Sequence, residues 1–202
     1  MKLNTKTILS ELKNHIPFTL LATLIAVILV GIIYKESILI SESFFYIIHP
    51  LHLFVSAIVS AAIFYKYKNN FIQALLIGIT GSIIIGSLSD IILPYLGGTL
   101  FQLKTSFHLS LIEKPILILS TVIIGSIVGI ITKFTKTPHF FHVFLSVFAS
   151  LLYLLAFSTS LNPIHFIAIF FIVFIAVLVP CCVSDIVFPL LFVRRKNEKK
   201  NI

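Results

Sequence analysis

Histidines and aspartates carry most of the chemistry that this sequence offers, and they recur in one duplicated pattern. The only two aspartates of the chain stand 95 residues apart in matching segments, S-D-I-I-L-P and S-D-I-V-F-P. Each copy places a histidine pair, H-x-x-H, before its aspartate, which gives the sets His49, His52 and Asp90 and His139, His142 and Asp185. An ionisable group inside an apolar stretch is expensive to keep, so both sets are functional-site hypotheses.

Two imidazoles and one carboxylate form a recognisable ligand set. Two histidines with one carboxylate commonly bind Fe(II), and histidine with aspartate also suits Zn, Mn, Co or Ni. The sequence therefore predicts a divalent transition-metal half-site in each copy. A histidine–aspartate pair that relays protons is the alternative, because imidazole titrates near neutral pH.

Serines continue the histidine pairs along the same helix faces. Residues three and four apart share one face of an α-helix. Each pair is followed at this spacing by two serines, and each aspartate is preceded by one more, so the predicted pathway-lining residues are Ser56, Ser60, Ser89, Ser146, Ser150 and Ser184.

Four further residues are candidate ligands. His108 and Glu113 precede the fourth apolar stretch, where Glu113 either supplements the first set or simply begins a helix, whose positive end favours a carboxylate. Cys181 and Cys182 precede the second aspartate, where they act either as soft thiolate ligands or as small apolar filler. Two adjacent cysteines provide no disulfide framework and are expected to be thiols.

The elements that position these residues are membrane spans. The chain is 58% hydrophobic and 11% charged, with a mean hydropathy of +1.12. An apolar run of about 20 residues is long enough to cross a membrane. Six such stretches are present: 18–34, 43–65, 71–96, 115–131, 140–161 and 163–193. The predicted fold is therefore an all-α integral membrane protein, and its first stretch is expected to be retained as a span rather than cleaved as a signal peptide.

The duplication extends beyond the ligand sets. The segment V-G-I-I at residues 30–33 recurs at residues 128–131, and Pro17 matches Pro115 at the same offset. Spans one to three thus correspond to spans four to six, and because three is odd the second copy must run in the opposite direction. The predicted architecture is six transmembrane helices in a 3+3 inverted-topology repeat, an arrangement that recurs in secondary transporters.

This architecture divides the chain into five parts. Residues 1–16 are expected to form a basic amphipathic segment on the inner membrane surface, and residues 194–202 a basic cytoplasmic tail. Repeat 1 covers residues 17–97, an outer loop covers 98–114, and repeat 2 covers 115–193.

The positive charge follows this topology. With both termini cytoplasmic, twelve of the fifteen lysines and arginines lie in inner segments, as the positive-inside rule requires for a multi-pass protein of the plasma, or inner, membrane. The net charge of +8 is spread over several short segments, which suits anionic lipid headgroups and does not suggest a nucleic-acid partner.

Three functions are compatible with this pattern. The first is a small transporter that moves a divalent transition metal, or is coupled to protons, through the two half-sites. The second is an intramembrane metal-dependent enzyme that uses the same residues, with Glu113 or an unliganded aspartate as base. The third is a structural or assembly subunit. Well-separated half-sites favour transport and one shared cage favours catalysis, whereas pairing with a second copy or a partner subunit is left open by the sequence.

Overall fold

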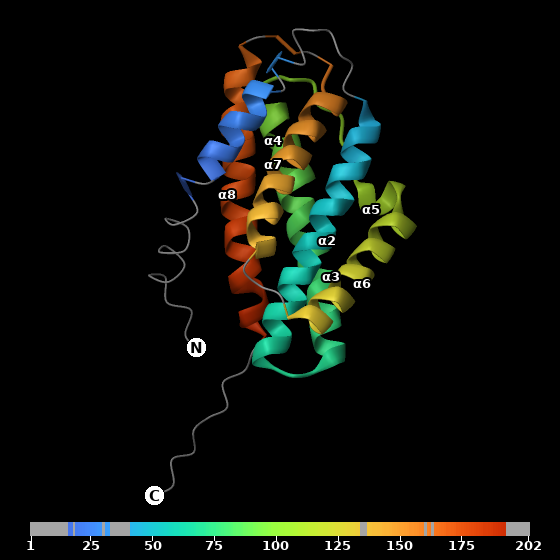
Figure 1. The fold of residues 1–202 in the computed structure, drawn as a ribbon. Helices are drawn as coiled ribbons and strands as arrows, with labels where there is room; N and C mark the ends of the chain where they lie inside the picture. The colour runs from blue at the N-terminus through green and yellow to red at the C-terminus, as the bar shows by residue number, and fades with distance from the viewer. Residues whose placement is uncertain are drawn as a thin grey trace, which may run out of the picture.

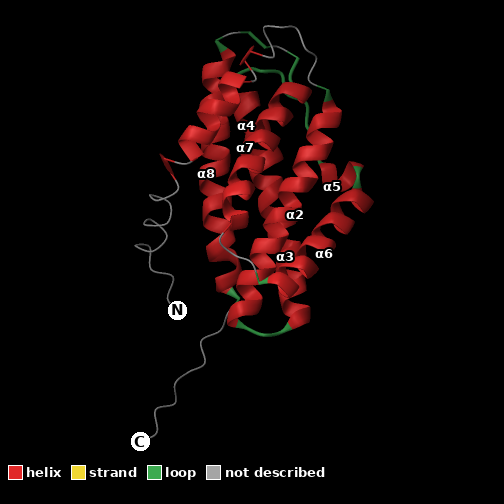
Figure 2. Ribbon diagram, in the orientation of Figure 1, coloured by secondary structure: helices red, strands yellow, loops and turns green. Residues whose placement is uncertain are grey.

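The protein is an assembly of helices. The computed structural model describes residues 16–17, 19–29, 31–32, 41–133, 137–159, 161–162 and 164–192, of which the side chains at 137–140, 181–187 and 190–191 lie outside the description. In chain order the labelled helices are α2 (Glu42–Tyr67), α3 (Phe71–Ser87), α4 (Leu93–Leu100), α5 (Ser110–Glu113), α6 (Pro115–Thr132), α7 (Thr137–Phe157) and α8 (His165–Leu191). Within these ranges no strand is found (Figure 2). Thr105 and Ser158 form an isolated bridge.

Three helices are long and apolar enough to cross a membrane. They are α2, the continuous helical segment Phe71–Leu100 and α6. The 26 residues of α2 span about 39 Å, more than the hydrocarbon thickness of about 30 Å. These three agree with the second, third and fourth predicted spans to within a few residues. Shorter apolar helices, Thr19–Leu29, Phe141–Phe157 and His165–Pro180, lie within the other three predicted stretches, which stay predictions as spans.

Local sequence signals explain where these helices begin and end. The α2–α3 hairpin is tight, and the Asn70 side chain accepts a hydrogen bond from the Gln73 N–H (3.0 Å), which caps α3. Pro115 begins α6, where its missing N–H costs nothing, and Lys133 ends it in a left-handed conformation. The predicted outer loop, 98–114, is partly helical, because α4 continues to Leu100 and α5 lies within it.

Helix packing places α2 at the centre of the bundle. It contacts α3, α6, α7 and α8, and it runs along most of the height of the molecule (Figure 1). The α6 backbone comes close to it at two glycines: a Cβ added at Gly125 would lie 2.6 Å from the Phe54 carbonyl oxygen, and one at Gly129 would lie 2.8 Å from the Ile58 Cα. Small residues allow such close approach between helices in membranes.

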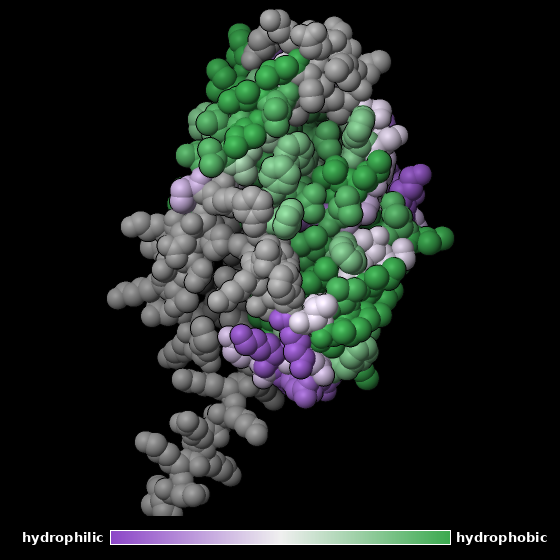
Figure 3. All heavy atoms as spheres, viewed as in Figure 1, coloured by the Kyte–Doolittle hydropathy of each residue, from purple (hydrophilic) through white to green (hydrophobic). Residues whose placement is uncertain are grey.

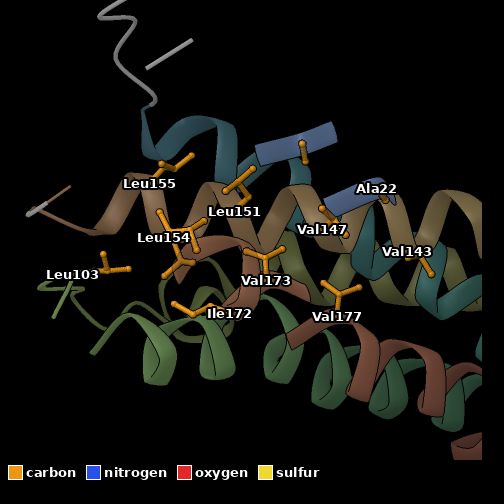
Figure 4. Packing of buried hydrophobic residues seen from close by; sticks show 12 residues of the cluster. Ala22, Leu103, Val143, Val147, Leu151, Leu154, Leu155, Ile172, Val173 and Val177 are labelled. Atoms are coloured by element: carbon orange, nitrogen blue, oxygen red, sulfur yellow. The ribbon is translucent and has the colours of Figure 1, made fainter. Parts of the chain in front are cut away.

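A second packing layer joins α7, α8 and the N-terminal helix. Apolar side chains from these helices, including Ala22, Val143, Val147, Val173 and Val177, interdigitate in the largest core cluster (Figure 4). Large apolar side chains also cover much of the outer surface of the described residues (Figure 3), and Ile116 is 83% exposed. An apolar exterior of this kind suits a lipid environment.

Candidate metal centre

Asp90 is placed by a break in the regular helix. Residues Leu88–Ile92 form a π-helical turn (η1) between α3 and α4, closed by a bond from the Leu93 N–H to the Leu88 carbonyl. Pro94 stands four residues after Asp90 and has no N–H to donate to the Asp90 carbonyl, which the α-helical pattern would require. Such π-turns are rare and occur frequently at functional sites. The S-D-I-x-x-P motif thus interrupts the α-helix with a π-turn at the position of its aspartate.

Four donors surround the Asp90 carboxylate. Oδ2 lies 2.8 Å from His49 Nδ1 and 2.6 Å from His52 Nδ1, both on the facing side of α2. Oδ1 accepts hydrogen bonds from the hydroxyls of Ser89 (2.7 Å) and Ser146 (2.9 Å). An ionised carboxylate only accepts hydrogen bonds, so this arrangement fits Asp90 as an anion whose two imidazole partners present Nδ1–H.

The cluster is fully enclosed. Asp90 and His52 are 0% exposed and His49 is 1% exposed. Among the described residues no lysine or arginine pairs with Asp90; its ion pairs are with the two histidines. An anion with two neutral imidazoles leaves one uncompensated negative charge in a low-dielectric interior, which is costly. The cluster is therefore chemically suited to take up one cation, either a proton on an imidazole or a metal ion.

The geometry allows two modes of metal binding. His49, His52 and Asp90 each offer a ligand atom within 4.8 Å of the others. In a tetrahedral site with ligands at about 2.0–2.1 Å, neighbouring ligand atoms are about 3.3 Å apart. A metal between the present Nδ1 and Oδ2 atoms would therefore have to push them apart by roughly 0.5–0.7 Å. Alternatively, a metal would bind the Nε2 atoms, and Asp90 would orient both rings through their Nδ1–H groups, as carboxylates do in many metal sites.

The second half of the chain completes this cluster from α7. The rings of His52 and His142 lie against each other, with centroids 4.5 Å apart and planes tilted by 35°. One turn along α7, Ser146 donates to Asp90, and one turn further Ser150 lies 3.0 Å from the Ser89 carbonyl oxygen. The first predicted half-site and His142 of the second are therefore adjacent, and the serines of α7 donate hydrogen bonds to Asp90 and to its neighbour Ser89.

Seven of the remaining predicted residues fall into two groups. Ser56 and Ser60 of α2 are each 1% exposed, so with the residues above nine predicted site residues are buried inside the protein. The others are placed only by their backbones in α7 and α8, and their side chains lie outside the described residues: His139, Cys181, Cys182, Ser184 and Asp185.

His108 and Glu113 do not join the buried trio. His108 Nδ1 lies 2.8 Å from Glu113 Oε1, and the other carboxylate oxygen of Glu113 accepts a hydrogen bond from the Tyr46 hydroxyl. Both residues are about one-third exposed. Glu113 is the last residue of the short helix α5, two residues before α6 begins, and it is not among the residues whose ligand atoms gather around Asp90.

An aromatic layer covers the buried cluster on the side toward the start of α2. The Phe45 ring stacks on His49 (5.2 Å) and packs against Tyr153 (5.4 Å) and Phe157 (5.5 Å), and His108 stacks on Phe157 (4.3 Å). These aromatic residues were not among the predicted site residues. The spacing of Phe45, four residues before His49, would have placed it on the histidine face, whereas its partners on α7 had no sequence signal.

Ser146→Ala tests the support that α7 gives to Asp90. The substitution removes one of two hydroxyl donors to Oδ1, and a hydrogen bond to a charged group contributes about 1.5–3 kcal/mol. We expect the free energy of unfolding in detergent, measured by denaturant titration with circular dichroism, to fall by that amount. The control is Ser120→Ala, because Ser120 is exposed and donates only to the Leu117 carbonyl of its own helix. Equal stability of the two variants would mean that Asp90 does not depend on Ser146.

The arrangement can therefore do two things chemically: it can coordinate a borderline transition metal through imidazole and carboxylate, or it can hold and pass a proton between them. No protein-family model, curated protein or solved structure matches the chain.

Proposed function

We propose that this chain is a small multi-pass membrane transporter that moves a divalent transition metal, or is coupled to protons, through its buried histidine–aspartate centre. The observation that carries this proposal is the trio His49, His52 and Asp90, a cation-seeking cluster at most 1% exposed within an apolar helical protein. Intramembrane ionisable groups that face the bundle interior commonly mark ion pathways. The ligand chemistry suits Zn, Fe, Mn, Co or Ni better than Ca or Mg, which prefer oxygen ligands.

The contact between His52 and His142 supports the inverted repeat on which transport would depend. These residues are equivalent in the two copies, since they are 90 residues apart, as are the other members of the two histidine pairs. In two copies related by a twofold axis, equivalent residues meet each other only at the axis. The pair lies about 15 Å along the roughly 39 Å length of α2, and transporter sites commonly lie at such a repeat interface near the bilayer midplane.

Two grooves at opposite ends of α8 also support this symmetry. One groove is lined by Gly97 of α4 and Ile172 of α8, and the other by Ile77 of α3 and Phe192. At the 95-residue offset of the two aspartates, Ile77 corresponds to Ile172 and Gly97 to Phe192. Each groove thus pairs a residue of the first copy with a residue of the second, and the equivalents of both residues line the other groove. An inverted repeat requires this relation.

Six spans with both termini in the cytoplasm complete the proposal. Lys133, at the end of α6, lies over the Tyr65 ring near the end of α2 (5.5 Å), which gathers positive charge at the proposed inner end. Lys114 lies over Tyr46 (5.7 Å) at the opposite end. In this orientation the aromatic layer closes the trio from the outside, and movement of one repeat against the other would expose Asp90 and Asp185 to opposite faces in turn.

A flux measurement tests the function. Purified protein in liposomes that contain a metal-sensitive dye is expected to admit Zn²⁺, Mn²⁺, Co²⁺ or Fe²⁺, and a pH-sensitive dye reports coupled proton movement. His52→Ala and His142→Ala should each reduce the flux by at least about tenfold, as loss of a ligand or its orienting partner does in metal sites. Glu42→Gln, an exposed change on α2, is the control and should leave the flux unaltered. Metal bound at wild-type level without flux of metal or protons would contradict transport.

An intramembrane metalloenzyme is the second candidate. It is favoured by the approach of His142 to His52, which gathers three imidazoles and one carboxylate in one place. It is disfavoured by the enclosure of all four side chains, since a substrate would need to reach them. The same liposomes separate the two functions, because a transporter moves the ion without an organic substrate.

A further inference from the structure

Two neighbouring cavities lie where α4 ends and α8 begins. The first, of about 610 Å³, is lined by six polar side chains, Tyr95, Thr99, Gln102, Lys104, Thr105 and His165, together with Phe101. The second, of about 270 Å³, is lined entirely by apolar residues of α4 and α8, and Phe101 forms part of both walls. One polar and one apolar cavity thus meet at a shared residue.

The polar cavity presents hydrogen-bond donors and positive charge. Lys104 carries a full charge, and the Gln102 amide and the Tyr95 hydroxyl are further donor groups in the walls. The Thr99 hydroxyl instead donates to the Tyr95 carbonyl oxygen (2.9 Å), and the Thr105 hydroxyl is paired with the Ser158 hydroxyl (2.8 Å). His165 Nδ1 accepts a hydrogen bond from the Asn162 N–H (3.3 Å), which leaves Nε2 as the ring nitrogen available to carry a proton. His165 is also the first residue of α8, where the helix dipole is positive. The described walls of the cavity include no carboxylate, and this chemistry suits an anion such as a phosphate group.

The apolar cavity continues along the two helices. Its walls on α4 include Leu96, Gly97 and Leu100, and those on α8 extend to Ala176. Eleven residues separate His165 from Ala176, which corresponds to about 16 Å along α8. The helices approach closely at Gly97, where an added Cβ would lie 2.6 Å from Ile172 Cγ2. The cavity is therefore a groove along the two helices rather than a deep pocket.

Together the two cavities match an amphipathic anion. In a bilayer an apolar groove by itself selects no ligand, because lipid chains are as apolar as the groove. Selectivity for a particular lipid must therefore come from the hydrogen-bond donors and the positive charge of the polar cavity at the end of the groove, where a lipid headgroup would lie. We propose that these cavities bind one anionic phospholipid, with its phosphate beside Lys104 and His165 and one acyl chain along α4 and α8. This site is independent of the metal centre and does not rest on transport.

Lipid binding in detergent tests the site. Native mass spectrometry of the full chain would compare phosphatidylglycerol with phosphatidylcholine of identical acyl chains. We expect phosphatidylglycerol to bind at least about tenfold more tightly. Lys104→Gln should remove most of this preference, since one lysine near a membrane surface changes anionic-lipid affinity several-fold, and Lys104→Arg should retain it. Lys114→Gln removes the same charge outside the cavity at the same end of the bundle and is expected to change nothing.

Two further arms separate the sources of the anion. Leu96→Trp should fill the apolar groove at an exposed position, weakening phosphatidylglycerol binding but not that of glycerol 3-phosphate. Inorganic phosphate should bind far more weakly than the lipid. Equal binding of the two lipids, an equal loss in Lys114→Gln, or phosphate binding as tight as that of phosphatidylglycerol would each overturn the proposal.

Discussion

Asp90→Asn is expected to abolish metal binding while the fold is retained. The asparagine amide is nearly isosteric with the carboxylate, and its two N–H groups can donate to His49 Nδ1 and His52 Nδ1, which become acceptors. Its oxygen still accepts from Ser89 and Ser146. The hydrogen-bond network is thus preserved, but at the two histidines the amide is now the donor and Nδ1 the acceptor.

The reversal blocks both of the binding modes described above. The lone pairs of both Nδ1 atoms are occupied by the amide, and the ring protons move to Nε2, so neither binding mode remains. The negative charge that made a cation favourable is also lost. Elemental analysis should find less than about a tenth of the wild-type metal, and the Kd should weaken by about 100-fold or more.

Glu42→Gln provides the matched control, because it makes the same acid-to-amide change at an exposed position on α2 and should keep the metal. Asp185→Asn, measured beside it, reports whether the second copy of the motif binds metal independently of the first. Equal and negligible metal in the wild type and both aspartate variants would reject the metal hypothesis and leave proton relay as the better account.

The membrane spans and the buried trio could be predicted from the sequence for definite reasons. Hydropathy alone located α2, the α3–α4 segment and α6, because a continuous apolar run of this length rarely occurs in a water-soluble fold. The spacing of His49 and His52 places them on one helix face, and the short connection between α2 and α3 brings Asp90 of the next span back beside them. Six spans and the inverted repeat stay predictions.

The details of the centre could not be predicted, since they depend on packing. The π-turn forms where Pro94 lacks the N–H that an α-helix would need, and hydropathy carries no signal for this effect. The sequence pattern places His142 in the second half-site, apart from His52. In the structure, α2 and α7 pack so that the two rings meet. The bond between Tyr46 and Glu113 likewise joins residues 67 positions apart that share no motif.

Gly129→Ala and Gly31→Ala are expected to change stability in opposite directions. The two glycines are equivalent in the duplicated V-G-I-I segment, so the substitution and its local sequence are the same. A Cβ at Gly129 would overlap the Ile58 backbone of α2, where no side chain can rotate away. At Gly31 no described heavy atom lies within 4 Å of an added Cβ.

The expected free energies follow from these surroundings. At Gly129 the α2 and α6 backbones must separate, and overpacking of this kind costs about 1–3 kcal/mol, more when backbone is displaced. At Gly31 alanine gains up to about 1 kcal/mol of helix propensity with nothing to offset it. Denaturant titration in detergent with circular dichroism measures both changes. Because α2 carries His49 and His52, loosening its contact with α6 should also weaken metal binding in Gly129→Ala, whereas Gly31→Ala should bind as the wild type does. Similar stability of the two variants would mean that α6 does not approach the α2 backbone as closely as Gly129 indicates.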